Sequence, residues 1–455
     1  MKPLVPLFVL ALLAAPAAVE TASKAESRVT EASVLGHLEF LAGDALNGRG
    51  SGTRDEWIAA TYIAAQLRRS GIEPLGDDGG YVQDVRIERS EVTAPPVLSV
   101  GDRTLTDGKE MVVSRLSAAR VSGPLQKYRA GVPVIAGAAL LLPDRLPFPT
   151  GAETVAAAMV ISIETEAART RRLASPARVL SIQHLAGVAG GAVIALDASS
   201  HAALASLPDG APIQLDADAK PPVVAHTWNA LGRLTGRTQT RADQVILLTA
   251  HLDHLGNRAP ATPPEPGADT IFNGADDDAS GSVAVLELAE ALARGRRPRR
   301  TTVFAWFGSE ESGGAGAAHF IDAPPVPLDH IVANLEFEMI GRGDRAVAPH
   351  TLWLTGYERS TLGPALAKHG ARIVADPHPG QNFFMRSDNI QLARRGVIAQ
   401  TVSSFGLHTD YHRPSDEVKT IDLAHMTEAI RSMVEPVLWL ANAGFRPEWS
   451  AGMKP

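Results

Sequence analysis

A chain of 455 residues with 45% hydrophobic residues is too long for one ordinary hydrophobic core, and it predicts a globular protein of about two domains. Its modest net charge of −7 excludes the strongly basic surface expected of a nucleic-acid-binding protein or of one that binds anionic membranes. The chain has no cysteine, so the mature protein must depend on its core, with or without bound metal, rather than on disulfides.

Residues 1–18 predict a signal peptide. They contain one Lys followed by an apolar stretch, and Ala15, Pro16 and Ala17 match the small-x-small pattern of a cleavage site. The alternative is a membrane anchor, but an apolar run of about 16 residues is short for a membrane span. We therefore expect a periplasmic or secreted protein that does not contact the membrane after signal cleavage.

Two helices are predicted in residues 19–92, which form the N-terminal part of the main domain. The first covers Ala32 to Leu46, and the second follows a Gly-rich loop and ends near Gly71. Residues 93–222 differ in character, because they combine short β-branched runs with much Gly, Pro and Ala and few chemically reactive side chains. We interpret 93–222 as an inserted, mostly β domain.

Residues 223–455 alternate buried strands with helices. The predicted strands are "QVILLTA", "TTVFAWFG", "HIVANLEFEMIG", "TLWLTG" and "GVIAQTVSS", and the helices are "SGSVAVLELAEALARG", "RSTLGPALAKHG" and "DLAHMTEAIRSMVEPVLWLANAG". Continuous apolar strands that alternate with helices are typical of an α/β domain whose largely parallel central sheet is flanked by helices.

Acids and imidazoles gather where these strands end, which is where α/β sheets carry their sites. The groups are His251, Asp253 and His254; Asp276, Asp277 and Asp278; Glu310 and Glu311; Glu336 and Glu338; and His408, Asp410 and His412. Each group has an ordinary explanation by itself, such as acids that cap a helix. Together, the unpaired carboxylates would repel one another and raise one another's pKa. A multivalent cation cancels that repulsion, and His with carboxylates is the ligand set of zinc.

The same residues suit a pair of zinc ions. Two zinc ions, three carboxylates, two neutral imidazoles and a bridging hydroxide are together electrically neutral, as a partly buried two-metal hydrolase site requires. One further carboxylate without a metal would act as general base, taking a proton from the metal-bound water and passing it to the leaving amine.

Five motifs in this order resemble the co-catalytic zinc aminopeptidases, such as the secreted bacterial leucyl aminopeptidases, with glutamate carboxypeptidase and glutaminyl cyclase as relatives. The motifs are "AHLDHLG", "GADDDASG", "FGSEESG", "EMIG" and "YHRPSD". The resemblance covers about Val223 to Gly444 and extends to "HLEFLAGDALNGRGSGT". It implies a three-layer zinc exopeptidase domain that holds two zinc ions, with residues 93–222 similar to a protease-associated domain.

The resemblance also implies a role for each motif residue. One metal would be held by His251 and Glu338, the other by Glu311 and His412, and both by Asp277, while Glu310 would be the general base and Asp253 would orient His251. Two departures from the family are the Glu before Met-Ile-Gly, where Asp is usual, and the Pro-rich insertion "RAPATPPEPGADTIF". Neither departure removes a ligand.

The choice of Glu338 over Glu336 rests on position. Both side chains point to one face of a strand, so alternation does not separate them. Glu338 lies nearer the carboxyl end and directly before Met-Ile-Gly, where the family has its acid. Glu336 would then be a partner of the ligands or the acceptor of a salt bridge from an Arg.

Four further residues are candidates for contact with substrate: Arg386, Asp388, His408 and Tyr411. Arg386 and Asp388 lie in "FFMRSDN", which resembles the family segment that helps to build the substrate end of the site. Arg386 would meet a carboxylate or carbonyl, or else form a structural salt bridge. His408 would contact substrate or hold its loop.

The expected function is an exported metallo-exopeptidase that hydrolyses peptide bonds at the N-terminus of peptides, with a water activated by two zinc ions and Glu310 as general base. Nucleic acid is not an expected partner, and the oligomeric state is open. The first alternative is a carboxypeptidase or dipeptidase, which needs a cationic pocket such as Arg386 would supply. A glutaminyl cyclase, which works with one metal, and a non-catalytic receptor-like module, which typically lacks ligands, are less expected.

Overall fold

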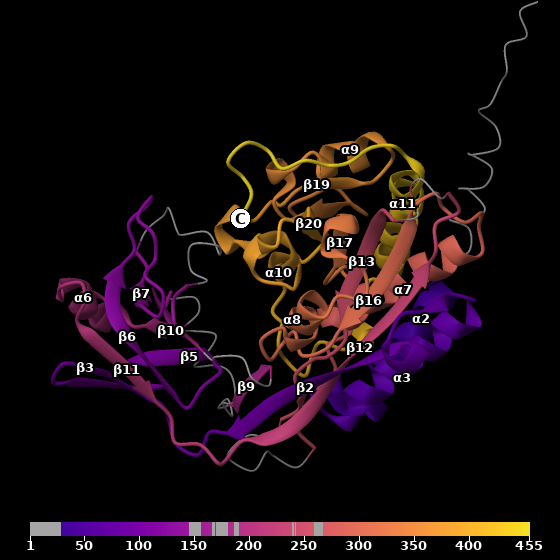
Figure 1. Cartoon of the computed structure of the whole chain (residues 1–455). Coiled ribbons are helices and arrows are strands. Elements are labelled where there is room, and N and C mark those ends of the chain that lie inside the picture. Colours follow the sequence, from indigo (N-terminus) through magenta and orange to yellow (C-terminus); the bar gives the residue numbers. More distant parts are fainter. Residues whose placement is uncertain are drawn as a thin grey trace, which may run out of the picture.

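The structure is a computed structural model that describes residues 29–144, 156–165, 169, 181–185, 191–238, 241, 243–258 and 267–455. The predicted signal peptide, residues 1–18, lies outside the described residues. In the described part, no helix has the length and apolar character needed to cross a membrane. The chain forms a larger body around one sheet and a smaller β-rich body beside it (Figure 1).

The larger sheet has ten strands among the described residues. Its order is β19 (Ile373–Ala375), β18 (Leu352–Leu354), β20 (Ala399–Ser403), β17 (Ile331–Phe337), β13 (Val245–His251), β16 (Thr301–Phe307), β12 (Val223–Leu234), β2 (Val82–Glu91) and β9 (Ser181–Leu185), with β1 (Glu73–Pro74) also paired to β12. Strands β20, β17, β13 and β16 run parallel, whereas β12, β2 and β9 continue the sheet antiparallel. The predicted α/β fold is confirmed, with the parallel pairing concentrated at the centre of the sheet.

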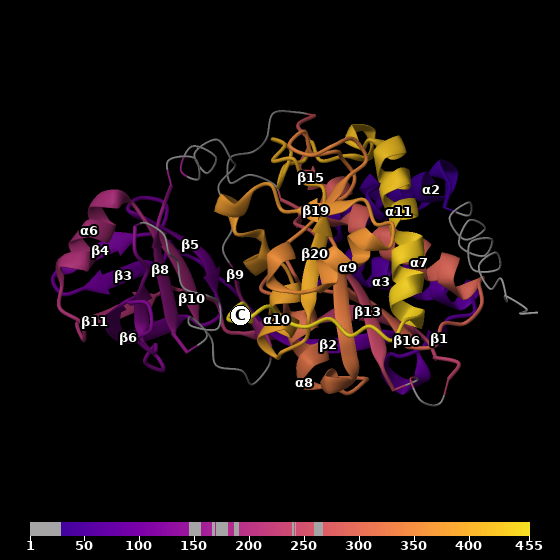
Figure 2. The same cartoon turned by 90° about the horizontal axis from the view of Figure 1, so that it is seen from above.

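Helices cover both faces of this sheet, which explains the continuous apolar strands. One layer contains α2 (Glu31–Leu41), α3 (Arg54–Arg69), α7 (Gly281–Ala293), α9 (Leu362–Lys368) and α11 (Leu423–Asn442), and the other contains α8 (Ala315–Asp322) and α10 (Asn389–Arg394) (Figure 2). Every residue of β13, β16 and β17 is buried between the layers. Parallel strands covered on both faces need apolar side chains at successive positions rather than at alternate ones.

Two element boundaries differ from the prediction for local backbone reasons. The first helix ends at Leu41 rather than Leu46, and Asn47 and Gly48 in the following turn have left-handed backbone angles. Strand β17 ends at Phe337, one residue before Glu338, because Met339 has a φ of 52° and turns the chain away from the strand direction.

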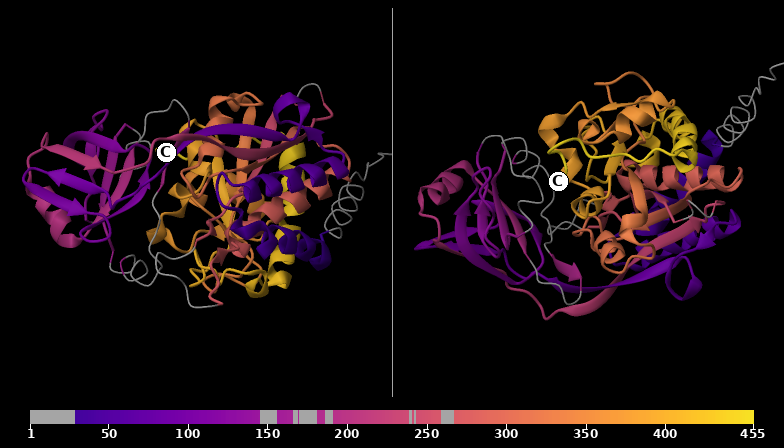
Figure 3. Two further views of the ribbon diagram at one scale, coloured as in Figure 1. Left: turned by 90° about the horizontal axis from the view of Figure 1, so that it is seen from below. Right: turned by 45° about the horizontal axis from the view of Figure 1, so that its top comes forward.

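The smaller sheet contains eight described strands and its own apolar core (Figure 3). Its order is β4 (Arg103–Thr106), β3 (Val97–Val100), β11 (Pro212–Asp216), β6 (Arg120–Lys127), β7 (Ala139–Leu141), β8 (Met159–Ile163), β10 (Ala192–Leu196) and β5 (Met111–Leu116), and α6 (Ala198–Ser206) packs on it. Strand β9 leaves this region and pairs with β2 at the edge of the larger sheet. The chain between β2 and β12 therefore forms a second β structure and also extends the first sheet.

Candidate metal centre and substrate pocket

The carboxyl edge of the parallel strands carries the candidate site. His251 is the last residue of β13, Glu311 follows β16, and Glu338 directly follows β17. His412 lies in the loop after β20, and Asp277 lies in the segment Ala275–Ser280 that leads into α7. Segments far apart in sequence therefore converge because parallel strands end at the same edge.

Asp277 lies at the centre of this cluster. Its Oδ1 lies 3.1 Å from His251 Nε2, and its Oδ2 lies 3.2 Å from His412 Nε2, which in turn lies 3.1 Å from Glu311 Oε1. His251, Asp277 and Glu338 each place a ligand atom within 4.8 Å of the others, and a second such group consists of His254, Asp277 and Glu311. One carboxylate shared by two groups is the arrangement that a bridged pair of metal ions requires.

The electrostatics of the cluster fit a cation. Burial is the largest cause that raises the pKa of Glu338, and burial also raises the pKa of Glu310, with Glu311 among the charges that add to it. Oε1 of Glu311 is buried and has no hydrogen-bond partner within the described residues. Crowded, partly unpartnered carboxylates beside imidazoles are a ligand set that zinc satisfies.

Without metal, we expect the chain to lose stability as the pH rises from about 4 to about 10. Burial raises the pKa of Asp388 to about 7, so the folded chain keeps a proton that the unfolded chain releases near its ordinary pKa of about 4. Burial opposes the charged form of His412, but Glu311 and Asp277 outweigh it and raise its pKa to about 10. Both groups bind protons more strongly in the folded chain, so deprotonation favours unfolding.

Thermal unfolding at several pH values between 5 and 9, with chelator and with zinc, checks this expectation. The unfolding temperature of the chelated chain should fall with pH, while bound zinc should offset the fall by replacing the protons. A chelated chain whose unfolding temperature rises with pH would show that these carboxyl and imidazole groups do not control its stability.

Asp253 lies against both His251 and Glu310. His251 Nδ1 lies 3.1 Å from the backbone oxygen of Asp253, whereas its distance to the Asp253 carboxylate is 3.8 Å. The carboxylate Oδ1 instead accepts a hydrogen bond of 2.9 Å from the backbone N–H of Glu310. The main-chain carbonyl is thus placed to fix the His251 tautomer, and the side chain fixes Glu310.

The acids around Asp277 accept hydrogen bonds from backbone N–H groups and do not act as ligands. Asp278 accepts hydrogen bonds from the backbone N–H groups of Gly281, Met339 and His251. Asp416 accepts from the backbone N–H groups of Asp276 and Asp277. These buried carboxylates tie the loop before α7 to the neighbouring strand ends, which fixes the position of Asp277. The peptide bond between Asp277 and Asp278 is cis.

Sequence reasoning missed two buried charges beneath the site. The Arg49 guanidinium donates to the carbonyl oxygens of four residues: Leu41, Leu252, Asn273 and Gly274. Glu56 accepts from Gly52 N, Ser309 N and Thr227 Oγ1, and so links the N-terminal segment to the strand end before Glu310. The only sequence signal was the Gly-rich segment around Arg49, whose contacts cross more than 200 positions of the chain.

Glu336 is fully buried and lies deeper than Glu338. Its Oε2 accepts from Asn389 N at 2.6 Å and from Thr401 Oγ1 at 3.4 Å, and the described residues offer it no Arg partner. Burial, followed by the negative charges of Asp388 and Glu338, raises its pKa well above the usual range. Of the two roles considered for Glu336, the hydrogen bonds of its side chain in the described part of the chain fit contact with the residues behind the ligands.

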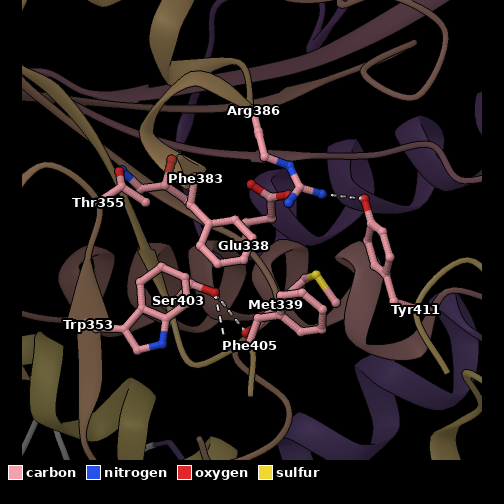
Figure 4. A pocket seen from close by; sticks show the side chains of 10 residues that line it. Glu338, Met339, Trp353, Thr355, Phe383, Arg386, Ser403, Phe405 and Tyr411 are labelled. Atoms are coloured by element: carbon pink, nitrogen blue, oxygen red, sulfur yellow. Dashed lines mark hydrogen bonds between the residues drawn. The ribbon is translucent and has the colours of Figure 1, made fainter. Parts of the chain in front are cut away.

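A pocket with both polar and aromatic walls opens beside Glu338 (Figure 4). Its walls include the aromatic rings of Trp353, Phe383, Phe405 and Tyr411. Trp353 stacks on Phe383 with ring centres 5.3 Å apart, and its indole N–H donates to Asp344 Oδ2. The pocket can therefore take an apolar side chain next to the metal ligand.

The structure separates the four substrate candidates. Arg386 and Tyr411 line the pocket, where the Arg386 guanidinium lies over the Phe383 ring and donates to the Tyr411 hydroxyl at 3.4 Å (Figure 4). His408 Nε2 lies 2.8 Å from Asp276 Oδ2, which is a contact that holds its loop. Asp388 is buried at the start of α10 and is not among the residues that line the pocket.

Comparison with known proteins agrees with this arrangement. The sequence pattern of Peptidase family M28 matches residues 229–436. A probable aminopeptidase of Saccharomyces cerevisiae is 25% identical over 233 residues, which are 49% of this chain and 58% of that protein. This chain thus spans less than two thirds of the length of that relative.

Two solved structures share the fold. The aminopeptidase from Aneurinibacillus sp. strain AM-1 superposes with a TM-score of 0.56 at 17% identity, covering 93% of this chain and 97% of that one. The zinc aminopeptidase from Bacillus subtilis gives 0.50 at 17% identity, again covering 93% of this chain and 97% of that one. The part of the chain that carries the site, residues 229–436, therefore resembles Peptidase family M28, and the two solved structures show that the fold is that of these aminopeptidases.

Proposed function

We propose that the chain is a zinc-dependent exopeptidase that removes residues from the N-terminus of peptides. The observation that carries this proposal is the pair of ligand groups that share Asp277, with Glu310 beside them. His251, Asp277 and Glu338 would hold one zinc ion, and Asp277, Glu311 and His412 the other. Zinc bound there would supply Lewis acidity toward a peptide carbonyl and would make water more acidic. We also propose that residues 1–18 act as a signal peptide that directs export of the chain.

Glu310 is the residue proposed to move protons. Its backbone is fixed by Asp253 Oδ1, and its carboxylate is not needed in either group of ligands. Burial raises its pKa, so the carboxylate is a stronger base than an exposed Glu. We assign to the Glu310 carboxylate the acceptance of a proton from the attacking water and its donation to the leaving amine.

The pocket beside Glu338 supports a preference for peptides with an apolar first residue. Its aromatic walls exclude water and contact a side chain without requiring a polar partner, and Asp344 fixes the Trp353 wall. An apolar side chain in this pocket would bring its own amino group and carbonyl to the metal edge.

Arg386 supports the carboxypeptidase or dipeptidase alternative. Its guanidinium lines the pocket, and within the described residues its hydrogen bond is a long one of 3.4 Å to Tyr411. A substrate carboxylate would be a stronger partner for this guanidinium than a phenol hydroxyl, because it carries the opposite charge and can accept two parallel hydrogen bonds.

A panel of matched peptides separates the two activities. One peptide has both ends free, the second is acetylated at its N-terminus, and the third is amidated at its C-terminus. We expect acetylation to lower kcat/KM by more than about 100-fold, because the site then loses a group that it binds directly, whereas amidation changes little. Loss of cleavage on amidation, with the acetylated peptide still cleaved, would instead identify a carboxypeptidase. Chelator should abolish cleavage, and zinc should restore it.

A further inference from the structure

His254 is a buried imidazole to which the ligand set assigned from the motifs, Asp277, Glu311 and His412, gives no role. It lies just beyond β13, and its backbone is fixed by a hydrogen bond of 3.0 Å from its N–H to the Arg49 oxygen. The residue is 1% exposed, and neither ring nitrogen has a hydrogen-bond partner within the described residues. Leaving buried polar atoms unpartnered costs about 1–3 kcal/mol each, so a partner absent from the protein itself is expected.

The His254 ring points at the carboxylates of the second ligand group. Nδ1 lies 2.9 Å from Glu311 Oε1 and 4.0 Å from Asp277 Oδ2. His412 Nε2 approaches the same two oxygens at 3.1 and 3.2 Å. Nitrogen and oxygen ligands on one tetrahedral zinc ion, with bonds of about 2.0–2.2 Å, lie roughly 3.3–3.6 Å from one another. The separations of 2.9, 3.1 and 3.2 Å are slightly shorter than this range, and the separation of 4.0 Å between His254 Nδ1 and Asp277 Oδ2 is slightly longer.

The neighbouring backbone leaves space for this ring. Gly274 has a φ of +56°, and a Cβ atom at this position would lie 2.5 Å from two ring carbons of His254. The same Cβ atom would lie 2.1 Å from the backbone oxygen of Asp277, so a larger residue would have to displace the Asp277 backbone, the imidazole or both.

We propose that His254 is a further protein ligand of the second metal ion, beside Asp277, Glu311 and His412. The inference rests on the proposed two-metal function. The ligand atoms of His254, Asp277 and Glu311 all lie within 4.8 Å of one another, which is close enough for the three side chains to hold one ion. The second site then has four protein ligands, whereas the first has His251, Asp277 and Glu338 and keeps an open position.

This asymmetry predicts unequal metal binding. The second site should fill first when metal-free protein is titrated with zinc, and its ion should exchange more slowly, because four protein ligands must release it. The first site, with three protein ligands, should fill at higher free zinc. The difference is measurable by competition with a chromophoric chelator, independently of any turnover.

Two variants at position 254 test the proposal. His254→Ala removes the ring, and His254→Asn keeps a side chain that can donate a hydrogen bond to Glu311 but is a poor zinc ligand. We expect both variants to weaken the tighter zinc site by more than about 100-fold, since the loss of residues that only orient a ligand costs about 10–100-fold. Cobalt substituted at that site should show a changed d–d absorption spectrum in both variants. His378→Ala, which removes an imidazole paired with Asp344, is the matched control and should keep both affinities.

Three outcomes would overturn the inference: wild-type affinity in His254→Asn, wild-type affinity in His254→Ala, or an unchanged cobalt spectrum in either variant. Failure of the two-metal function has a different signature, because the wild-type chain would then bind fewer than two zinc ions. Circular dichroism of each zinc-loaded variant separates loss of a ligand from loss of the fold, and a folded His254→Asn with a weakened tight site supports the proposal.

Discussion

Glu310→Gln is expected to lower kcat on a free-amine peptide by about 10²–10⁴-fold while both zinc ions stay bound, which is the contribution of a general base. The amide keeps the size of the side chain and the backbone hydrogen bond to Asp253, but it cannot accept the proton. Because the substrate pocket is unchanged, KM should change little. Steady-state kinetics and zinc content by mass spectrometry, measured on the same preparation, check both parts.

Glu336→Gln is the matched control for this variant. Its carboxyl is also buried at the carboxyl edge, but its hydrogen bonds within the described residues come from Asn389 and Thr401, and an amide oxygen can accept the same bonds. We expect turnover within a few-fold of wild type. A Glu310→Gln enzyme with near-normal turnover would show that another group accepts the proton, and loss of zinc from it would show that Glu310 is a ligand.

Asp277→Asn is expected to remove both zinc ions and to lower activity by roughly 10³-fold or more, since the Lewis acidity of the site is worth several kcal/mol. Asp277 is the only residue that belongs to both ligand groups among the described residues. An Asn has one carbonyl oxygen and an NH₂ group that does not bind zinc, so it cannot bridge two ions. Zinc content after gel filtration, with activity at rising zinc concentration, measures the loss.

Asp322→Asn serves as the control, because Asp322 is an exposed acid paired with Arg395 far from the metal edge. Its zinc content and activity should match those of the wild type. Retention of two zinc ions by Asp277→Asn would mean that the two sites do not share a carboxylate and that the ligand assignment is wrong.

The fold was predictable from sequence where one physical cause dominates. The strands β13, β16 and β17 are buried on both faces, so their apolar runs identify them directly. Strand β9 was not predictable, because its pairing with β2 depends on the path of the chain through the smaller sheet rather than on its own residues. The end of β17 was missed because it depends on the left-handed backbone at Met339.

The candidate site was likewise predictable in part from the sequence. Their positions at strand ends and in motifs predict that His251, Asp277 and Glu338 lie close together. The structure places their ligand atoms within 4.8 Å of one another, which is close enough to hold one ion. His254 stands in the same motif as His251, but nothing in its spacing shows that its ring points at Glu311. Contacts such as those of Glu56 with the strand end before Glu310 arise from tertiary packing and leave no local pattern.

Anomalous diffraction at the zinc edge from crystals of the wild-type chain tests the central claim most directly. We predict two zinc peaks on opposite sides of Asp277, one beside His251 and Glu338 and the other beside Glu311 and His412. A single peak, or peaks that do not contact Asp277, would contradict the assignment of this edge as a bridged two-metal centre.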